Sequence, residues 1–292
     1  MTTSGSSDYA TFRRALRRAA PSLQRPLPWI RHADPWAILV SEVMLQQTQT
    51  SRVIEPWVRF LERFPTPEAC ADAPLSSVLT LWGGLGFPRR AKALHEAARM
   101  IRDDFGGSVP SDVRSLRSLA GVGEYTANAV ASFAFDQRVA VLDTNVGRVV
   151  ARALANRSLN SREARATAEA LLPRRDVASF NQALLDLGAQ YCKSSPLCQE
   201  CPVQRSCAWR REGGADPAPM SAGVSRPQSK YVGSNRQIRG RVLAVLRLGP
   251  ATRMALAQAL EDVDPDRREP IIEGLISDGL VQRTRRGFQL AR

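Results

Sequence analysis

The spacing of apolar residues along residues 1–210 is the feature that most constrains the fold. Apolar side chains recur at helical spacing, for example at Ile38, Leu39, Leu45 and Ile54, whereas alternating strand patterns are scarce. Prolines and glycines interrupt these runs, so we expect short helices joined by tight turns. The expected helices include residues 74–82, 90–103, 112–119, 124–135, 145–155, 162–172 and 180–191. This part of the chain is therefore predicted to be all-α.

The C-terminal region has a different pattern. Residues 213–235 are rich in Gly, Pro, Ser and Ala and lack periodicity, which predicts a linker. Three short helices are expected at 236–248, 253–261 and 270–279, followed by a strand pair at 281–290 around Arg286-Gly287. This order predicts a small winged-helix-like α+β module.

The charge of the chain indicates a polyanionic partner. The formal net charge is +13, and nucleic acid is the commonest partner of so basic a protein. No run of about 18 apolar residues occurs, so we expect no membrane span. The polar N-terminal segment has no apolar stretch behind its arginines and does not look like a secretory signal. We expect a cytoplasmic, nucleoid-associated protein.

Four of the five cysteines lie within sixteen residues, in the pattern Cys192-x5-Cys198-x2-Cys201-x5-Cys207. Cytosolic thiols stay reduced, so this clustering favours metal ligation over disulfides. Zinc and iron–sulfur clusters both accept four cysteines, and the spacing alone does not decide between them. Cys70 stands apart and is expected to be a small buried residue.

The segment 41–49, Ser-Glu-Val-Met-Leu-Gln-Gln-Thr-Gln, places an acid on an aliphatic helix face. Burial among aliphatic side chains raises the pKa of a carboxylate, so Glu42 could stay protonated and act as a general acid. The alternative is an ordinary solvated helix glutamate. Gln46, Gln47 and Thr48 follow one turn later and suit hydrogen bonds to base edges.

Two further motifs indicate contact with nucleic acid. Gly121-Val122-Gly123 lies between two expected helices and makes a tight hairpin, whose backbone N–H groups can approach a phosphate. In its setting this is the helix-hairpin-helix pattern of DNA-binding proteins. Asp143 follows an apolar run at the start of a helix, where it is either an N-cap or a charged carboxylate facing a developing positive sugar, and the two roles are compatible.

Together these segments resemble the helix-hairpin-helix DNA glycosylase superfamily, specifically adenine DNA glycosylases of the MutY type. The resemblance covers roughly residues 10–210. It rests on residues 27–29, 41–49, 84–86, 121–123, 142–145 and 180–188 and on the four cysteines. It implies a helical domain made of 1–33 and 143–212, a six-helix domain at 34–142, and a linker and C-terminal module after them.

The resemblance also implies the chemistry. Glu42 takes the place of the acid that protonates adenine at N7, and Asp143 the place of the carboxylate that stabilises the oxocarbenium-like sugar. Tyr125 and Asn145 match residues that assist this pair. The adenine is flipped out of the duplex into a pocket to which Trp29 and Gln182 contribute.

Further residues follow from the same resemblance. Gln47, Thr48, Leu85 and Phe87 match residues that wedge into the base stack and touch an opposite 8-oxoguanine. The cysteines match the ligands of a [4Fe–4S] cluster. Strand-cleaving relatives carry a lysine where this chain has Tyr125, which favours a monofunctional hydrolytic glycosylase.

Three departures accompany the resemblance. The first cysteine gap is five residues where the family usually has six. Phe87-Pro88 replaces a common pair of tyrosines. The region after Gly233 is too short for the NUDIX-like domain that reads 8-oxoguanine in longer members.

The expected partner is double-stranded DNA with an A:8-oxoguanine or A:G pair, bound by a monomer. The alternatives are a thymine or uracil mismatch glycosylase and a non-catalytic, metal-sensing DNA-binding regulator.

Overall fold

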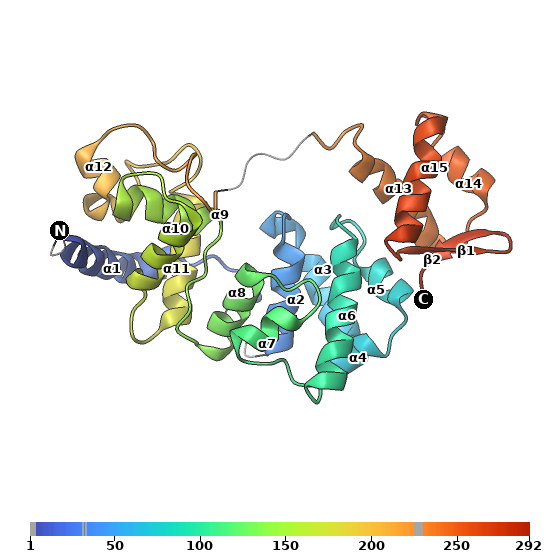
Figure 1. Ribbon diagram of the computed structural model, residues 1–292, viewed down its shortest axis with the longest axis horizontal. Helices are drawn as coiled ribbons and strands as arrows, with labels where there is room; N and C mark the ends of the chain where they lie inside the picture. Colours follow the sequence, from blue (N-terminus) through green and yellow to red (C-terminus); the bar gives the residue numbers. More distant parts are fainter. Residues whose placement is uncertain (1–3, 31, 33, 225–229) are drawn as a thin grey trace. The chain divides into compact units, whose positions relative to one another are not determined.

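The computed structural model describes residues 4–30, 32, 34–224 and 230–292 of the chain. It divides into two compact units (Figure 1). Unit 1 comprises residues 1–33, 111–113 and 123–227, and unit 2 comprises residues 34–110, 114–122 and 228–292. The fold is mostly helical with one small sheet at the C-terminus, which confirms the predicted fold class. None of the helices in the described part of the chain is long and apolar enough to cross a membrane.

Unit 1 is a helical bundle around one apolar core. Its helices are α1 (Ser4–Leu23), α8 (Glu124–Phe135), α9 (Thr144–Val149), α10 (Ser161–Leu171), α11 (Val177–Gln190) and α12 (Ala208–Glu212). Helix α11 packs against both α1 and α9. Phe12 and Leu16 of α1, Val146 of α9 and Leu184 of α11 are almost fully buried in the shared core. One stretch was predicted as a single helix at 145–155, but it changes to π-helical turns at Val150–Ala155.

The helical part of unit 2 contains α2 (Pro35–Leu45), α3 (Ile54–Arg63), α4 (Pro67–Ala71), α5 (Leu75–Leu81), α6 (Arg89–Asp104) and α7 (Val113–Ser118). Only the first residue of α7, Val113, is assigned to unit 1. Trp57 and Trp82 are buried in its core. The Trp57 indole N–H donates to the Ala37 carbonyl at 2.9 Å, which ties α3 to α2. His95 is an ordinary buried residue, bonded to the Ala73 carbonyl at 2.8 Å.

The C-terminal module contains α13 (Asn235–Leu248), α14 (Arg253–Ala259), α15 (Pro265–Ser277) and the strands β1 (Val281–Thr284) and β2 (Gly287–Leu290). The strands are antiparallel, with Val281 opposite Leu290, and Ala251 forms a bridge to Phe288. Helices followed by a small hairpin sheet give the winged-helix-like order that the sequence predicts. The module belongs to unit 2, where the Lys92 ammonium donates to the Asp278 carbonyl at 3.0 Å.

The unit boundaries differ from those drawn on the sequence. Residues 123–142 belong to unit 1, although the sequence assigns them to the six-helix domain. Residues 213–224 pack against unit 1, where a linker was expected: the Ala222 N–H donates to the Leu159 carbonyl at 2.8 Å. Residues 225–229 of the expected linker lie outside the described residues.

Candidate active site

Glu42 lies inside unit 2 on helix α2. Asp34 caps this helix by accepting from the Trp36 N–H at 3.0 Å, and Pro35 occupies its first position, where a missing N–H costs nothing. Helix α2 is buried along most of its length, and Glu42 is only 5% exposed. The acid therefore lies in the apolar interior, as its position among aliphatic residues predicted, and is not a solvated surface glutamate.

Arg90 holds together the segments that surround the end of α2. Its guanidinium donates to the carbonyls of Val43, Met44 and Gln46 at 2.9, 2.8 and 2.6 Å. It also donates to the Thr48 hydroxyl at 3.0 Å and to the Gly86 carbonyl at 3.1 Å. Burial lowers the pKa of Arg90 to about 10. Sequence reasoning missed this residue, because its partners are backbone carbonyls on segments that are distant in the chain.

The two loops fixed by Arg90 contain the predicted base-contact residues. Gln47 and Phe87 both have positive φ, 56° and 46°, a conformation that is costly for side chains larger than glycine and is concentrated at functional sites. Phe87 is half-buried, with the guanidinium of Arg90 5.4 Å and that of Arg236 5.6 Å from its ring centroid. Leu85 is only 3% exposed, so its side chain packs inside the unit. In this conformation it does not project from the surface to insert between bases, as the sequence predicted it would.

The hairpin between α7 and α8 has the local geometry that its two glycines predict. Gly121 has φ 73°, and a Cβ there would lie 2.6 Å from the Cβ of Ala93, so only glycine fits. Gly123 is the N-cap residue of α8, and both glycines are exposed, while Val122 is 6% exposed and anchors the turn. The Gln46 amide donates to the Gly121 carbonyl at 3.3 Å, which ties the loop after α2 to the hairpin.

Asp143 in unit 1 is the N-cap residue of helix α9, which confirms the predicted capping role. Its carboxylate accepts from the Val146 N–H at 2.8 Å and from the Asn145 amide at 2.7 Å. Burial raises the pKa of Asp143, whereas these hydrogen bonds and the charge of Arg148 oppose that rise. The carboxylate is thus held in one orientation, with donors that stabilise its charged form.

Arg148 connects Asn145 to the cysteine segment. Its guanidinium donates to the Asn145 side-chain oxygen at 2.6 Å, to the Cys192 carbonyl at 2.6 Å and to the Gly188 carbonyl at 3.1 Å. Asn145 therefore has its oxygen bound by Arg148 and its amide directed at Asp143. This arrangement orients the amide that the sequence assigned as an assisting group.

The remaining predicted pocket residues also belong to unit 1. Tyr125, on α8, packs against the core of the unit, and Trp29 is 7% exposed. The Gln182 amide donates at 3.0 Å to Asp186, which also accepts from Arg25 at 2.6 Å. The amide nitrogen of Gln182 is therefore oriented by a buried carboxylate. The sequence did not single out Asp186, which is buried on α11.

The four cysteines belong to unit 1, where Cys192, Cys201 and Cys207 pack against the apolar core. Burial raises the pKa of the Cys201 thiol to about 11, with smaller contributions in the same direction from Cys192, Cys207 and Cys198, so the four thiols are electrostatic neighbours. Within the residues that the structure describes, no three His, Cys, Asp or Glu side chains are grouped closely enough to hold a single metal ion.

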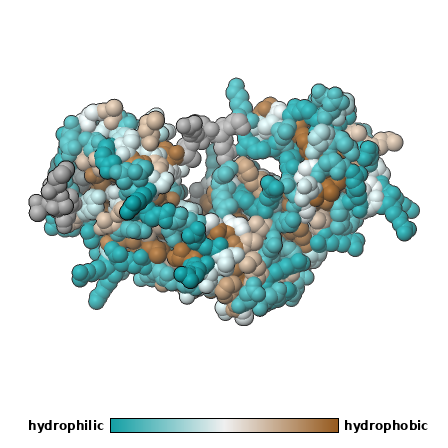
Figure 2. Space-filling model, viewed as in Figure 1, coloured by the Kyte–Doolittle hydropathy of each residue, from teal (hydrophilic) through white to brown (hydrophobic). Residues whose placement is uncertain are grey.

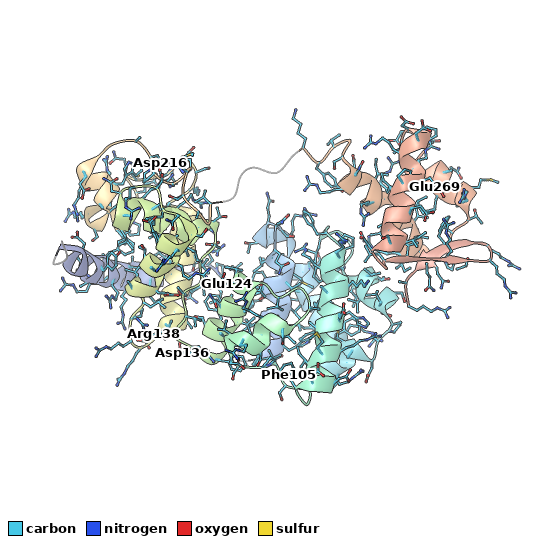
Figure 3. The ribbon with its side chains drawn as sticks, in the orientation of Figure 1. Phe105, Glu124, Asp136, Arg138, Asp216 and Glu269 are labelled. Atoms are coloured by element: carbon cyan, nitrogen blue, oxygen red, sulfur yellow. The ribbon has the colours of Figure 1, made fainter. Side chains whose placement is uncertain are left out.

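The buried side chain of Arg152 forms hydrogen bonds to the start of the cysteine segment. It is 1% exposed and donates to the Lys193 carbonyl at 2.6 Å and to the Cys192 sulfur at 3.4 Å. Asp216, labelled in Figure 3, accepts two hydrogen bonds from this guanidinium, at 2.8 and 2.6 Å. A buried cation beside a thiol stabilises the thiolate form that metal ligation requires. Neither Arg152 nor Asp216 carries a local sequence signal.

The candidate residues are distributed over both units. Unit 2 contains Glu42, Gln46, Gln47, Thr48, Leu85, Phe87, Gly121 and Val122, and unit 1 contains Asp143, Asn145, Tyr125, Trp29, Gln182, Gly123 and the four cysteines. A buried glutamate, an oriented carboxylate and a helix-hairpin-helix are the features expected of a DNA base-excision enzyme. Residues 40–174 match the family described as HhH-GPD superfamily base excision DNA repair protein.

Comparison with individual proteins narrows the class. The chain is 47% identical to the adenine DNA glycosylase of Mycobacterium tuberculosis, with 89% of this chain and 86% of that protein covered. It is 44% identical to the adenine DNA glycosylase of Mycolicibacterium smegmatis, with 92% of each covered. A solved thermostable thymine-DNA glycosylase superposes with a TM-score of 0.65 at 27% identity, over 70% of this chain and 98% of that one. The chain belongs to the adenine DNA glycosylase family.

Proposed function

We propose that this protein hydrolyses the N-glycosidic bond of an adenine mispaired with 8-oxoguanine or guanine in duplex DNA. Its family supports adenine removal in base excision repair by a DNA N-glycosylase. The observation that carries the proposal is the buried carboxyl group of Glu42 on α2, since few structural roles explain an acid at 5% exposure among aliphatic residues.

Glu42 and Asp143 divide the chemistry. Glu42 protonates N7 of the extruded adenine, which turns the base into a neutral leaving group. Asp143, kept charged by the Val146 and Asn145 donors, stabilises the positive sugar that develops as the bond breaks. Tyr125 replaces the lysine of strand-cleaving relatives, so water is the nucleophile and the DNA strand stays intact.

The loops and the hairpin hold the DNA. The exposed backbone at Gly121 and Gly123 approaches a phosphate, and Gln47, Thr48 and Phe87 contact the bases at the emptied position. Arg90 keeps these loops in place through its backbone contacts. Trp29 and the oriented Gln182 contribute to the adenine pocket.

The cysteines would hold a [4Fe–4S] cluster. Four half-buried thiols that act on one another, with Arg152 beside Cys192, suit an anionic cluster of this type. When bound, the cluster supplies a rigid cross-link that stabilises the segment 192–207 and orients its basic residues toward DNA. Iron and labile sulfide in purified protein support this assignment, whereas zinc in their place contradicts it. We further propose a monomer that acts in the cytoplasm, at the nucleoid.

A base-release assay tests the proposed specificity. Duplexes with A:8-oxoguanine, A:G, T:G and U:G pairs are incubated with the protein, and each released base is quantified. We expect adenine from the first two duplexes and no release from the others. Release of thymine or uracil without adenine would favour the mismatch glycosylase, and binding without any release would favour the regulator.

A further inference from the structure

A groove of about 460 Å³ lies within unit 2, between the helical part and the C-terminal module. Its lining comes from the end of α3, from α5, from the end of α13 and from β2 with the residues after it. The module is seated there by direct contacts, since the Arg247 guanidinium donates to the Leu79 carbonyl at 3.3 Å. None of the candidate active-site residues lines this groove.

The charged side chains that line the groove are all positive. They are Arg63, Arg247 and Arg292, which come from three separate segments. No Asp or Glu side chain of the described residues lines the groove, and none of these three arginines forms a salt bridge within the described part of the chain.

Other arginines of the same module behave differently. Arg239, Arg241, Arg253 and Arg283 pair with Asp278, Asp262, Glu269 and Glu273, respectively. Glu269 is labelled in Figure 3, and Figure 2 shows hydrophilic residues over most of the visible face of the module. Four arginines of the module are thus ion-paired, whereas none of the three groove arginines pairs with an acidic side chain of the described residues.

Like charges around one hollow repel each other, and the repulsion grows where water is partly excluded. Arg247 is half-buried, and burial lowers its pKa. A cleft lined by one sign of charge focuses its field and attracts the opposite charge. Beside the arginines, Ser76 and Ser77 bring hydroxyl groups that can donate hydrogen bonds to an anionic oxygen. The ligand chemistry that fits is a phosphate group.

The arrangement favours a chain of phosphates over a single ion. The three guanidinium groups are supplied from separate elements, and the same hairpin whose strand β2 lines the groove exposes Arg285 and Arg286 at its turn. We propose that this groove binds the phosphodiester backbone of duplex DNA and extends the DNA contact of the enzyme beyond the candidate active site. This proposal rests on the DNA repair function proposed above.

The test compares the salt dependence of binding to undamaged duplex DNA by the full-length protein. The groove variant is a double variant that combines Arg63→Gln and Arg292→Gln, both at exposed positions. The matched control is a double variant that combines Arg241→Gln and Arg253→Gln, whose arginine side chains are ion-paired. Each lost phosphate contact makes the negative slope of log K against log salt shallower by about 0.9. The slope of the double variant should therefore be shallower than that of the wild type by roughly 2. At 0.15 M salt this corresponds to about thirty-fold weaker binding.

The outcomes separate this proposal from the proposed function. A reduced slope in the groove variant with an unchanged slope in the control supports a DNA backbone site. An unchanged slope in both, together with normal adenine release, overturns the groove assignment and leaves the glycosylase intact. Titration with inorganic phosphate forms a second arm: saturable binding that the groove variant loses, without any change in DNA binding, would reassign the groove to a small phosphorylated ligand.

Discussion

Replacing Asn145 with alanine should move the acid limb of the rate profile to higher pH. Asn145 donates to the Asp143 carboxylate at 2.7 Å and favours its charged form. In the proposed mechanism, only ionised Asp143 stabilises the sugar, so the rate falls as the pH falls through the pKa of Asp143. Burial already raises that pKa above 3.8, and the loss of a donor raises it further.

The magnitude follows from the hydrogen bond that is lost. A hydrogen bond to a charged group contributes about 1.5–3 kcal/mol, and the lower end applies because the Val146 N–H still donates at 2.8 Å. Since about 1.4 kcal/mol is a factor of ten, the ratio of ionised to protonated Asp143 should fall about tenfold. At a pH on the acid limb the single-turnover rate should therefore fall about tenfold, while the rate on the plateau changes less.

The assay is single-turnover adenine release from a saturated A:G duplex, measured across pH for the wild type and Asn145→Ala. Asn128→Ala is the matched control, because the Asn128 amide donates to the Ala140 carbonyl at 3.1 Å and, within the described part of the chain, forms no hydrogen bond with Asp143. An acid limb at the same pH in wild type and Asn145→Ala would refute the assigned role of the Asn145 donor.

The raised pKa of Asp143 also sets the sign of its effect on stability. The folded protein holds this proton more tightly than the unfolded chain, whose ordinary value is 3.8. The stabilising contribution of protonated Asp143 is therefore fully present below pH 3.8 and is lost as the pH rises through the folded-state pKa. We expect Asp143→Asn, a neutral replacement that can keep the cap, to abolish adenine release and to raise the melting temperature at neutral pH. A lower melting temperature would contradict this sign.

Further variants test other parts of the site. Glu42→Gln should lower the rate of adenine release at least 10²-fold with little change in duplex affinity, and near-normal release would remove Glu42 from the role of acid. Gly121→Ala should destabilise the protein by about 2 kcal/mol in denaturant unfolding, because of the positive φ and the clash with Ala93, whereas Gly123→Ala, with open space at its Cβ, should have a small effect. Arg90→Gln should cost about 3 kcal/mol of unfolding free energy, while Arg89→Gln, at an exposed position, should cost under about 1 kcal/mol. Equal effects within either pair would contradict the geometry described for it.

The features set by local sequence could be predicted. Helical spacing located the helices, and two glycines around one apolar residue identified the hairpin, because φ and close packing at Gly121 are local requirements. Burial of Glu42 followed from its aliphatic neighbours on α2. The N-cap at Asp143 followed from its position before a helix.

The features set by long-range contacts could not be predicted. Residues 213–224 have the composition of a linker, yet Asp216 ties them to the buried Arg152. In the sequence, Arg90 has no feature that separates it from other basic helix residues. In the structure it binds the carbonyls at the end of α2. Leu85 lies within a matched motif, and only the structure shows that its side chain is buried. For Asp216 and Arg90 the deciding partner is distant in the chain.

The proposed mechanism requires Glu42 and Asp143 to act on opposite parts of one extruded adenosine nucleotide. A crystal structure of the protein with duplex DNA containing a non-cleavable adenosine analogue tests it most directly. We expect the Glu42 carboxyl within hydrogen-bonding distance of the purine N7 position and the Asp143 carboxylate next to the anomeric carbon of the same nucleotide. A complex in which the two carboxyl groups face different nucleotides, or in which either one is far from the extruded base, would contradict it.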